Sequence, residues 1–269
     1  MRYILLFIAI FTFSCKYNIS SPVGTIKDYS ANSGKLFYTS SNDKTNDIET
    51  TLKKNKHSLG IYKIVVSNGN STAILTNIKK VLNKNPHFNN VEIDLSQTKI
   101  TNIPKNIFTN TTNLGKITLP DTVTNIEEKA FSGCSSLSYI RFSGSLTNIG
   151  TNAFSNCSAL TVLLLPDGLK TIEKCAFYDC SSLVNLFLPK SLTKIEDDAF
   201  KNCSQLKNLE YLGTKSDCSK LDNCQPFSSG SNLSNLYLPS MDGTSTNIIG
   251  SNFLGRSWTT TNYGKHIPN

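Results

Sequence analysis

The sequence contains little histidine and no dense cluster of basic residues. Its three histidines, His57, His87 and His266, lie far apart, and no two of them have the spacing of metal ligands. No glycine-rich phosphate loop follows a predicted strand. The formal charge is +8, but Lys and Arg are scattered and do not form the block that is typical of nucleic-acid-binding proteins. We therefore expect no metal, no other cofactor and no nucleic-acid partner.

The apolar run near the N-terminus is too short to span a membrane. It extends from Tyr3 to Phe13 and follows Arg2, as is typical of a secretory signal peptide, here residues 1–14. The residues up to Cys15 resemble a relaxed bacterial lipobox, in which Cys15 would be lipidated. We expect an exported protein that is lipid-anchored at the bacterial cell envelope and exposed on the outer membrane. The alternative is secretion after ordinary signal cleavage.

A 23-residue repeat occupies the middle of the chain. Three residue types return at constant phase: Leu114, Leu137, Leu160, Leu183 and Leu206; Phe108, Phe131, Phe154, Phe177 and Phe200; and Cys134, Cys157, Cys180 and Cys203. Fixed self-similarity near this length predicts a solenoid, in which each unit buries its apolar face against its neighbours. A solenoid usually offers a long surface and not a pocket. The repeat therefore favours binding over catalysis.

Each repeat predicts a short parallel strand followed by a sharp turn. Between Leu160 and Leu165 alternate side chains point inward, and Pro166 ends the strand because proline cannot donate to the next coil. An Ala-Phe pair follows in four repeats, and its rings should stack along the solenoid axis. The residues before the repeat cysteines tolerate positive φ, which predicts a tight turn at Gly133, Asn156, Asp179 and Asn202.

Four further segments complete the predicted organisation. Residues 15–55 are polar and have too few apolar side chains to offset the entropy of ordering, so they predict a flexible tether. Residues 56–90 combine a β-branched strand, Ile61–Val66, with a helix from Ile74 to Leu82. With the strand that follows at 91–95 they form a β-α-β cap. Residues 91–256 are the solenoid and residues 257–269 a C-terminal tail. The predicted fold class is an α/β-type solenoid with a parallel β-sheet.

The repeat pattern resembles the leucine-rich repeat of BspA-like bacterial surface proteins. Four repeats contain Ala-Phe-x-x-Cys at constant spacing, and the cap and the variant C-terminal repeats are similar to those of spirochaetal lipoproteins. The resemblance implies a leucine-rich-repeat fold and adhesion to host matrix proteins or to other bacteria. One departure is visible: the repeat at 206–232 is four residues too long and has Gly230 where cysteine belongs.

The repeat cysteines are expected to be buried, reduced thiols. Stacked in register, their Cβ atoms would lie about 4.8 Å apart, whereas a disulfide needs about 3.8 Å. Four sulfur atoms in a row also cannot surround a metal ion tetrahedrally. Cys218 and Cys224 lie in the oversized repeat, where a disulfide could staple its bulge. Cys175 has no repeat counterpart and is expected to face outward.

The candidate binding site is the outward face of the strands. On each strand, the residues on either side of the central inward side chain point away from the core. The predicted protein-binding residues are Tyr139, Arg141, Val162, Leu164, Asn185, Phe187, Asn208, Glu210 and Tyr237. Exposed apolar and aromatic patches mark interaction surfaces, and Tyr and Arg are frequent in binding hot spots. In the alternative interpretation, the patch packs against a terminal segment, or β-propensity alone selected these residues.

The sequence therefore predicts a monomer that binds a protein ligand and is held to a membrane by its lipid anchor. The ligand would be host extracellular matrix or another bacterial surface protein. The alternative is a periplasmic or envelope scaffold that has no host ligand. An enzyme is not expected, because no histidine lies on the repeats to activate a nucleophile.

Overall fold

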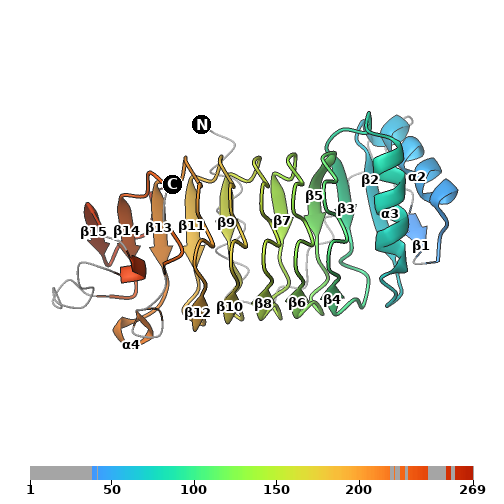
Figure 1. Cartoon of the computed structure of the whole chain (residues 1–269). Helices are drawn as coiled ribbons and strands as arrows, with labels where there is room; N and C mark the ends of the chain where they lie inside the picture. Colours follow the sequence, from blue (N-terminus) through green and yellow to red (C-terminus); the bar gives the residue numbers. More distant parts are fainter. Residues whose placement is uncertain are drawn as a thin grey trace, which may run out of the picture.

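The computed structural model describes residues 38–40, 42–218, 221, 225–227, 230–241, 253–255 and 258–268. The predicted signal peptide, Cys15 and Cys224 lie outside these residues. The chain forms a solenoid in which successive coils lie side by side, with two helices at its N-terminal end (Figure 1). The predicted α/β solenoid is thus confirmed.

The longer strands lie in one row, which we call the main sheet. It consists of two five-stranded parallel sheets, ordered β1-β2-β3-β5-β7 and β9-β11-β13-β14-β15. Their bounds are β1 Tyr38–Ser40, β2 Lys63–Ser67, β3 Val91–Asp94, β5 Leu114–Thr118, β7 Tyr139–Arg141, β9 Val162–Leu164, β11 Asn185–Leu188, β13 Asn208–Tyr211, β14 Asn235–Leu238 and β15 Thr260–Tyr263. Among the described residues no ladder joins β7 to β9.

A third parallel sheet of two-residue strands runs along the opposite side of the coils (Figure 1). Its strands are β4 Asn102–Ile103, β6 Asn125–Ile126, β8 Asn148–Ile149, β10 Thr171–Ile172 and β12 Lys194–Ile195. Each residue of these strands pairs with the residue 23 positions away on the neighbouring strand. The β8–β10 pairing keeps the coils adjacent where the main sheet is interrupted.

The repeat phenylalanines form a continuous stack inside the solenoid, the phenylalanine spine. It extends from Phe108 to Phe227, with ring centroids 5.0 to 5.5 Å apart and nearly parallel planes in the central pairs. The first five rings are completely buried, because the alanine that precedes four of them leaves room for the ring. Burial and offset stacking of aromatic rings both stabilise this arrangement.

Each coil from Phe108 to Phe200 has two turns with positive φ, of which the sequence predicts one. The predicted turn before each repeat cysteine is confirmed at Gly133, Asn156, Asp179 and Asn202, where φ lies between 59° and 75°. The residue before each Ala-Phe pair also has positive φ, and there the chain uses Lys129, Asn152, Cys175 and Asp198. Cys175 therefore does have repeat counterparts, as a turn residue.

The N-terminal cap is larger than predicted. The strand–helix–strand unit is present as β2, α3 (Ala73–Lys84) and β3. The expected tether, however, was wrong from residue 38 onward, because β1 pairs with β2 and α2 (Thr45–Leu59) packs beside α3. Ile48 and Leu52 lie one turn apart and are fully buried, while Asn55 donates its side-chain amide to the carbonyl of Lys63. A narrow apolar stripe in a polar segment is thus enough to dock the helix.

The C-terminal end also differs from the expectation. The oversized repeat accommodates its four extra residues between β13 and Phe227, where α4 (Lys215–Cys218) lies, so β13 pairs with β14 at an offset of 27 residues. The short 3₁₀ helix Phe253–Gly255 follows. Residues 257–269 are not merely a tail, because Thr260–Tyr263 form β15 and extend the main sheet.

Candidate functional site

Parallel pairing places the outward side chains of the main sheet in two columns, which we call the outer face. In the C-terminal half Asn185 lies beside Val162 and Asn208, and Phe187 beside Leu164 and Glu210. Tyr237 continues the second column beyond Glu210. In the N-terminal half Lys116 lies beside Tyr139, and Thr118 beside Arg141. The predicted pattern of outward residues therefore matches the observed register within each half.

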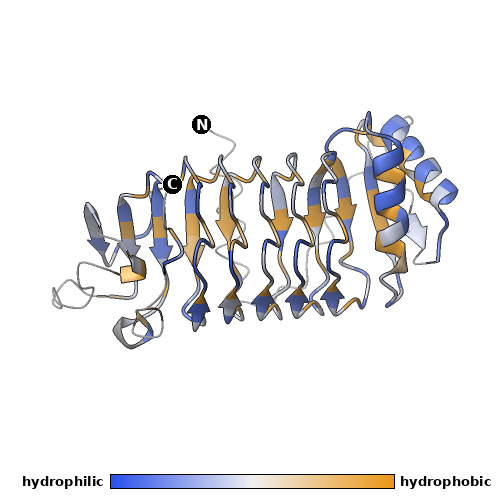
Figure 2. Ribbon diagram, viewed as in Figure 1, coloured by the Kyte–Doolittle hydropathy of each residue, from blue (hydrophilic) through white to orange (hydrophobic). Residues whose placement is uncertain are grey.

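An apolar patch occupies the middle of the outer face. Val162 and Leu164 are 42% and 44% exposed, and Phe187, next to Leu164 on β11, is half-buried. Figure 2 shows β9 as hydrophobic along its length, because both of its outward positions hold aliphatic residues. Val184, which directly precedes β11, is 38% exposed. Sequence reasoning missed Val184 because it stands outside the two outward positions of the strand. We call Val162, Leu164 and Phe187 the apolar patch.

Tyr139 and Arg141 lie on β7, across the interruption of the main sheet. They are on the coil next to the patch, but no strand pairing joins them to Val162 and Leu164 among the described residues. The Arg141 guanidinium donates to Asp121 at 3.2 Å and to the carbonyl of Leu119 at 3.4 Å. Partial burial raises the pKa of Tyr139, against the opposing effect of Arg141, so its hydroxyl stays protonated at neutral pH.

A shallow groove of about 400 Å³ lies on the N-terminal half of the outer face. Its charges largely neutralise one another, since Glu92 lies 2.8 Å from Lys116 and 3.9 Å from Lys63. Half-exposed pairs of this kind contribute little to stability. The groove reaches Tyr139 and so borders the region next to the patch; its lining is Lys63, Glu92, Ile93, Asp94, Lys116, Thr118 and Tyr139.

On the C-terminal half, the first outward column is a ladder of asparagine side chains. The amide of Asn208 donates to Asn185 at 2.8 Å, and that of Asn235 donates to Asn208 at the same distance. These bonds fix the side chains across three strands. Asn185 and Asn208 were predicted binding residues; the ladder gives them a structural role and leaves Asn185 at the border of the apolar patch.

Glu210 was predicted to be part of the open binding face, and this was wrong. Its residue exposure is 3%, although it points outward from β13. The C-terminal segment covers it: His266 Nδ1 lies 2.6 Å from one carboxylate oxygen, and the backbone N–H of Ile267 donates to the other at 2.8 Å. A terminal segment therefore does lie on the outer face, but at β13, beside the apolar patch.

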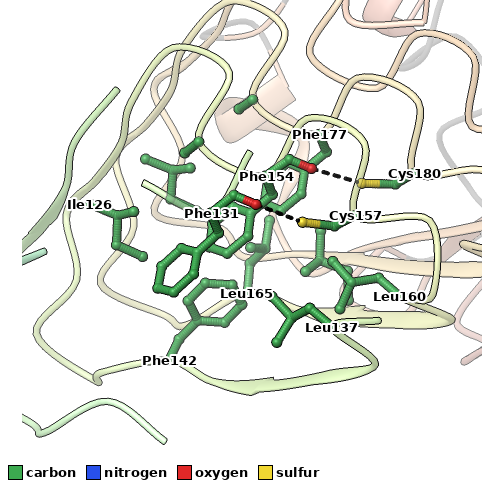
Figure 3. Close-up of a cluster of buried hydrophobic side chains, with 14 of the residues drawn as sticks. Ile126, Phe131, Leu137, Phe142, Phe154, Cys157, Leu160, Leu165, Phe177 and Cys180 are labelled. Carbon is green, nitrogen blue, oxygen red and sulfur yellow. Dashed lines mark hydrogen bonds between the residues drawn. The ribbon is translucent and has the colours of Figure 1, made fainter. Parts of the chain in front are cut away.

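The repeat cysteines form a buried column in which each thiol donates to a backbone carbonyl. The acceptor is the spine phenylalanine of the preceding coil, as Figure 3 shows for Cys157 with Phe131 and Cys180 with Phe154, at 3.2 and 3.3 Å. The four thiols are free, as predicted. Burial raises the pKa of Cys134 and Cys203 to about 12, and raises that of Cys157 well above its ordinary value. Such thiols are poor nucleophiles and metal ligands at neutral pH.

Two further cysteines of the described residues, Cys175 and Cys218, lie outside this column. Cys175 is partly exposed, and burial raises its pKa as well. Cys218 is buried at the end of α4, and because Cys224 lies outside the described residues, their disulfide stays a prediction. Across the described ranges, no group of three or more His, Cys, Asp or Glu side chains could hold a metal ion. No helix in the same ranges is long and apolar enough to cross a membrane.

Comparison with protein families gives a match that spans most of the solenoid. A family model described as the BspA type leucine rich repeat region matches residues 101–225 and 159–267, with six copies of the repeat. These ranges together span more than half of the chain. No curated protein matches the sequence.

Several solved structures are similar to this chain. A leucine-rich repeat protein of T. pallidum is 23% identical, with a TM-score of 0.45, and the match covers 64% of this chain and 68% of that protein. A Bacteroides ovatus leucine-rich repeat protein is 26% identical, with a TM-score of 0.35, over 55% of this chain and 48% of its own. The pneumococcal vaccine antigen PcpA is 17% identical, with a TM-score of 0.47, over 66% of this chain and 42% of its own. The matched region is therefore less than half of the latter two proteins.

Proposed function

Because the chain belongs to the BspA-type leucine-rich-repeat family, we propose that it binds a protein partner through the outer face of its main sheet. The solenoid supports this role, since the stacked coils hold outward side chains at fixed spacing on a rigid scaffold. Across the described ranges, no cluster of metal ligands competes with this interpretation. The proposed function is therefore binding.

The apolar patch is the observation on which the proposal depends. Of the five large hydrophobic side chains that are most exposed in the described residues, Val162, Leu164 and Val184 lie in or directly before two neighbouring strands. Isolated exposed apolar residues are ordinary, whereas a contiguous group marks an interaction surface. Polar side chains of Asn185 and Arg141 lie around it and would form the rim of such an interface.

We extend the proposal to where the protein works. The lipobox-like Cys15 and the apolar run before it favour a lipid-anchored protein at the cell surface. The partner would then be host matrix protein or another bacterial surface protein, and binding would serve adhesion. The other proposal, an envelope scaffold, shares the same binding face and differs only in topology. Protease digestion of intact cells separates the two: the solenoid is cleaved if it faces outward and survives if it faces the periplasm.

Replacing the patch tests the proposed binding face. The combined variant Val162→Ser, Leu164→Ser and Phe187→Ser removes the apolar surface but keeps β-strand positions that solvent already reaches. The partner is first isolated by pull-down with the wild-type full chain. We expect the affinity of the variant for this partner to be at least about 100-fold lower than that of the wild type, because hot-spot residues each contribute about 2 kcal/mol or more.

The matched control is Ile61→Ser, which removes an exposed apolar side chain from the cap. It should bind like the wild type. Circular dichroism and thermal unfolding verify that every variant is folded. Unchanged binding by the folded patch variant would remove the proposal.

A further inference from the structure

Glu210 is an outward-facing carboxylate that the chain itself has buried. Its side chain is 4% exposed, whereas the side chain of His266, which pairs with it, is 70% exposed. Its register neighbours on β11 and β14 are the aromatic residues Phe187 and Tyr237. A buried carboxylate is costly unless it is hydrogen-bonded, and the described contacts of both its oxygens come from the C-terminal segment.

The path of that segment is short and defined. After β15 ends at Tyr263 the chain turns at Gly264, where φ is 63° and the N–H bonds the carbonyl of Leu238. His266 and Ile267 then reach Glu210, two strands back across β14. Two strand spacings are about 10 Å, which three extended residues span. We call residues 265–268 the C-terminal strap.

The strap is fastened to the outer face at few points. Its described bonds to the sheet are the two to Glu210, and Ile267 is 8% exposed while Lys265, His266 and Pro268 are exposed. The strand β14 beneath it, by contrast, is paired on both sides. Segments with few buried contacts open locally, at much lower free energy than the sheet.

We infer that the C-terminal strap is the resident ligand of a second binding subsite on the outer face, formed by Glu210 between Phe187 and Tyr237. With the strap in place, the open face ends at the apolar patch. When the strap leaves and the sheet stays intact, the face extends to β14 and offers a carboxylate between two aromatic side chains. Its ligand is an extended partner segment with the chemistry of the strap: a basic or imidazole side chain followed by an apolar residue. This rests on the proposed function of the outer face.

Hydrogen exchange of the full chain tests the release of the strap. We expect the amide of Ile267 to exchange at least about 100-fold faster than that of Leu236 in β14, because the strap opens without the sheet. Exchange of both amides at one common rate would overturn the inference, since the strap would then open only with global unfolding. This readout needs no partner, so it can fail or succeed independently of the proposed function.

A second measurement tests the ligand class. The probe is a synthetic peptide with the sequence of residues 264–269, added to the full-length variant His266→Ala/Ile267→Ala, whose own strap has lost its anchoring side chains. We expect saturable binding by NMR at millimolar peptide, and its loss when Glu210→Gln is added. The wild-type chain should bind the peptide at least about 2-fold more weakly, because its tethered strap competes at an effective concentration of the same millimolar order as the peptide. Absence of saturable binding to the strap variant would overturn the assigned ligand.

Discussion

At the scale of single residues, the solenoid depends on turns that most side chains disfavour. Each coil from Phe108 to Phe200 has a positive-φ residue two positions before its spine phenylalanine, and the chain places Asn at two of these positions, Asn106 and Asn152. At the equivalent position Cys175 has φ of 56°. A left-handed backbone costs a residue with a Cβ atom about 1 to 2 kcal/mol, and asparagine less.

Replacing Cys175 with asparagine should therefore stabilise the protein. We expect Cys175→Asn to raise the free energy of unfolding by about 0.5 to 1 kcal/mol, measured by urea denaturation. The matched control, Cys175→Ala, removes the same thiol without easing the backbone. Equal stabilisation by the two variants would show that the thiol, and not the turn, is responsible.

At the scale of elements, burial of the cysteine column makes the stability of the fold depend on pH. Folding raises the pKa of Cys203 from its ordinary value of 9.0 to about 12, because burial disfavours the thiolate. Between these values the unfolded chain has lost this proton and the folded chain retains it. The contribution of this thiol to the free energy of unfolding is therefore fully present below pH 9. It falls as the pH rises toward 12, by about 1.4 kcal/mol per pH unit for each such thiol.

The variant Cys203→Ser isolates this effect. Serine keeps a donor for the carbonyl of Phe177, to which the Cys203 thiol donates, but it does not titrate in this range. Urea denaturation from pH 7 to 10.5 should give a constant stability difference from the wild type below pH 9. Above pH 9 the free energy of unfolding of the wild type should fall more steeply with pH than that of Cys203→Ser. Parallel profiles over the whole range would contradict the buried-thiol account.

The repeat elements could be predicted from the sequence, because one period fixes the strand, the turn and the side chains that stack. The stacking of Phe131 and of Cys134 with their counterparts follows directly from this period. Helix α2 could not be predicted in this way, since Ile48 and Leu52 are isolated apolar residues in a polar segment and their burial depends on β2 and α3. The outward columns follow from strand alternation, but the covering of Glu210 does not, because its partner His266 lies 56 residues further along the chain.

At the scale of the whole molecule, the coils are held together mainly by contacts between neighbours. The ring of Phe154 lies 5.0 Å from that of Phe131 and 5.1 Å from that of Phe177, so it links three coils. Stability in such an array is a sum of unit and interface terms, and the loss of one ring weakens both interfaces. Within each half, the outer face has continuous columns only while this register holds.

Two phenylalanine substitutions measure how much the spine contributes. We expect Phe154→Ala to lower the free energy of unfolding by about 3 to 5 kcal/mol, because it opens a cavity in a fully buried stack. Phe187→Ala also removes a phenylalanine ring, but from the outer face, and should lower the free energy of unfolding by about 1 kcal/mol or less. Chemical denaturation compares them, and similar losses would mean that the rings are not differently buried.

The outer face as a binding surface is tested most directly by photo-crosslinking in cells that make the full-length protein. A photoreactive phenylalanine analogue is placed at Leu164 in one variant and at Ile61, equally apolar and exposed, in the other. The account predicts a discrete crosslinked partner from position 164 and none from position 61. Crosslinking from position 61 alone, or from neither position, would contradict it.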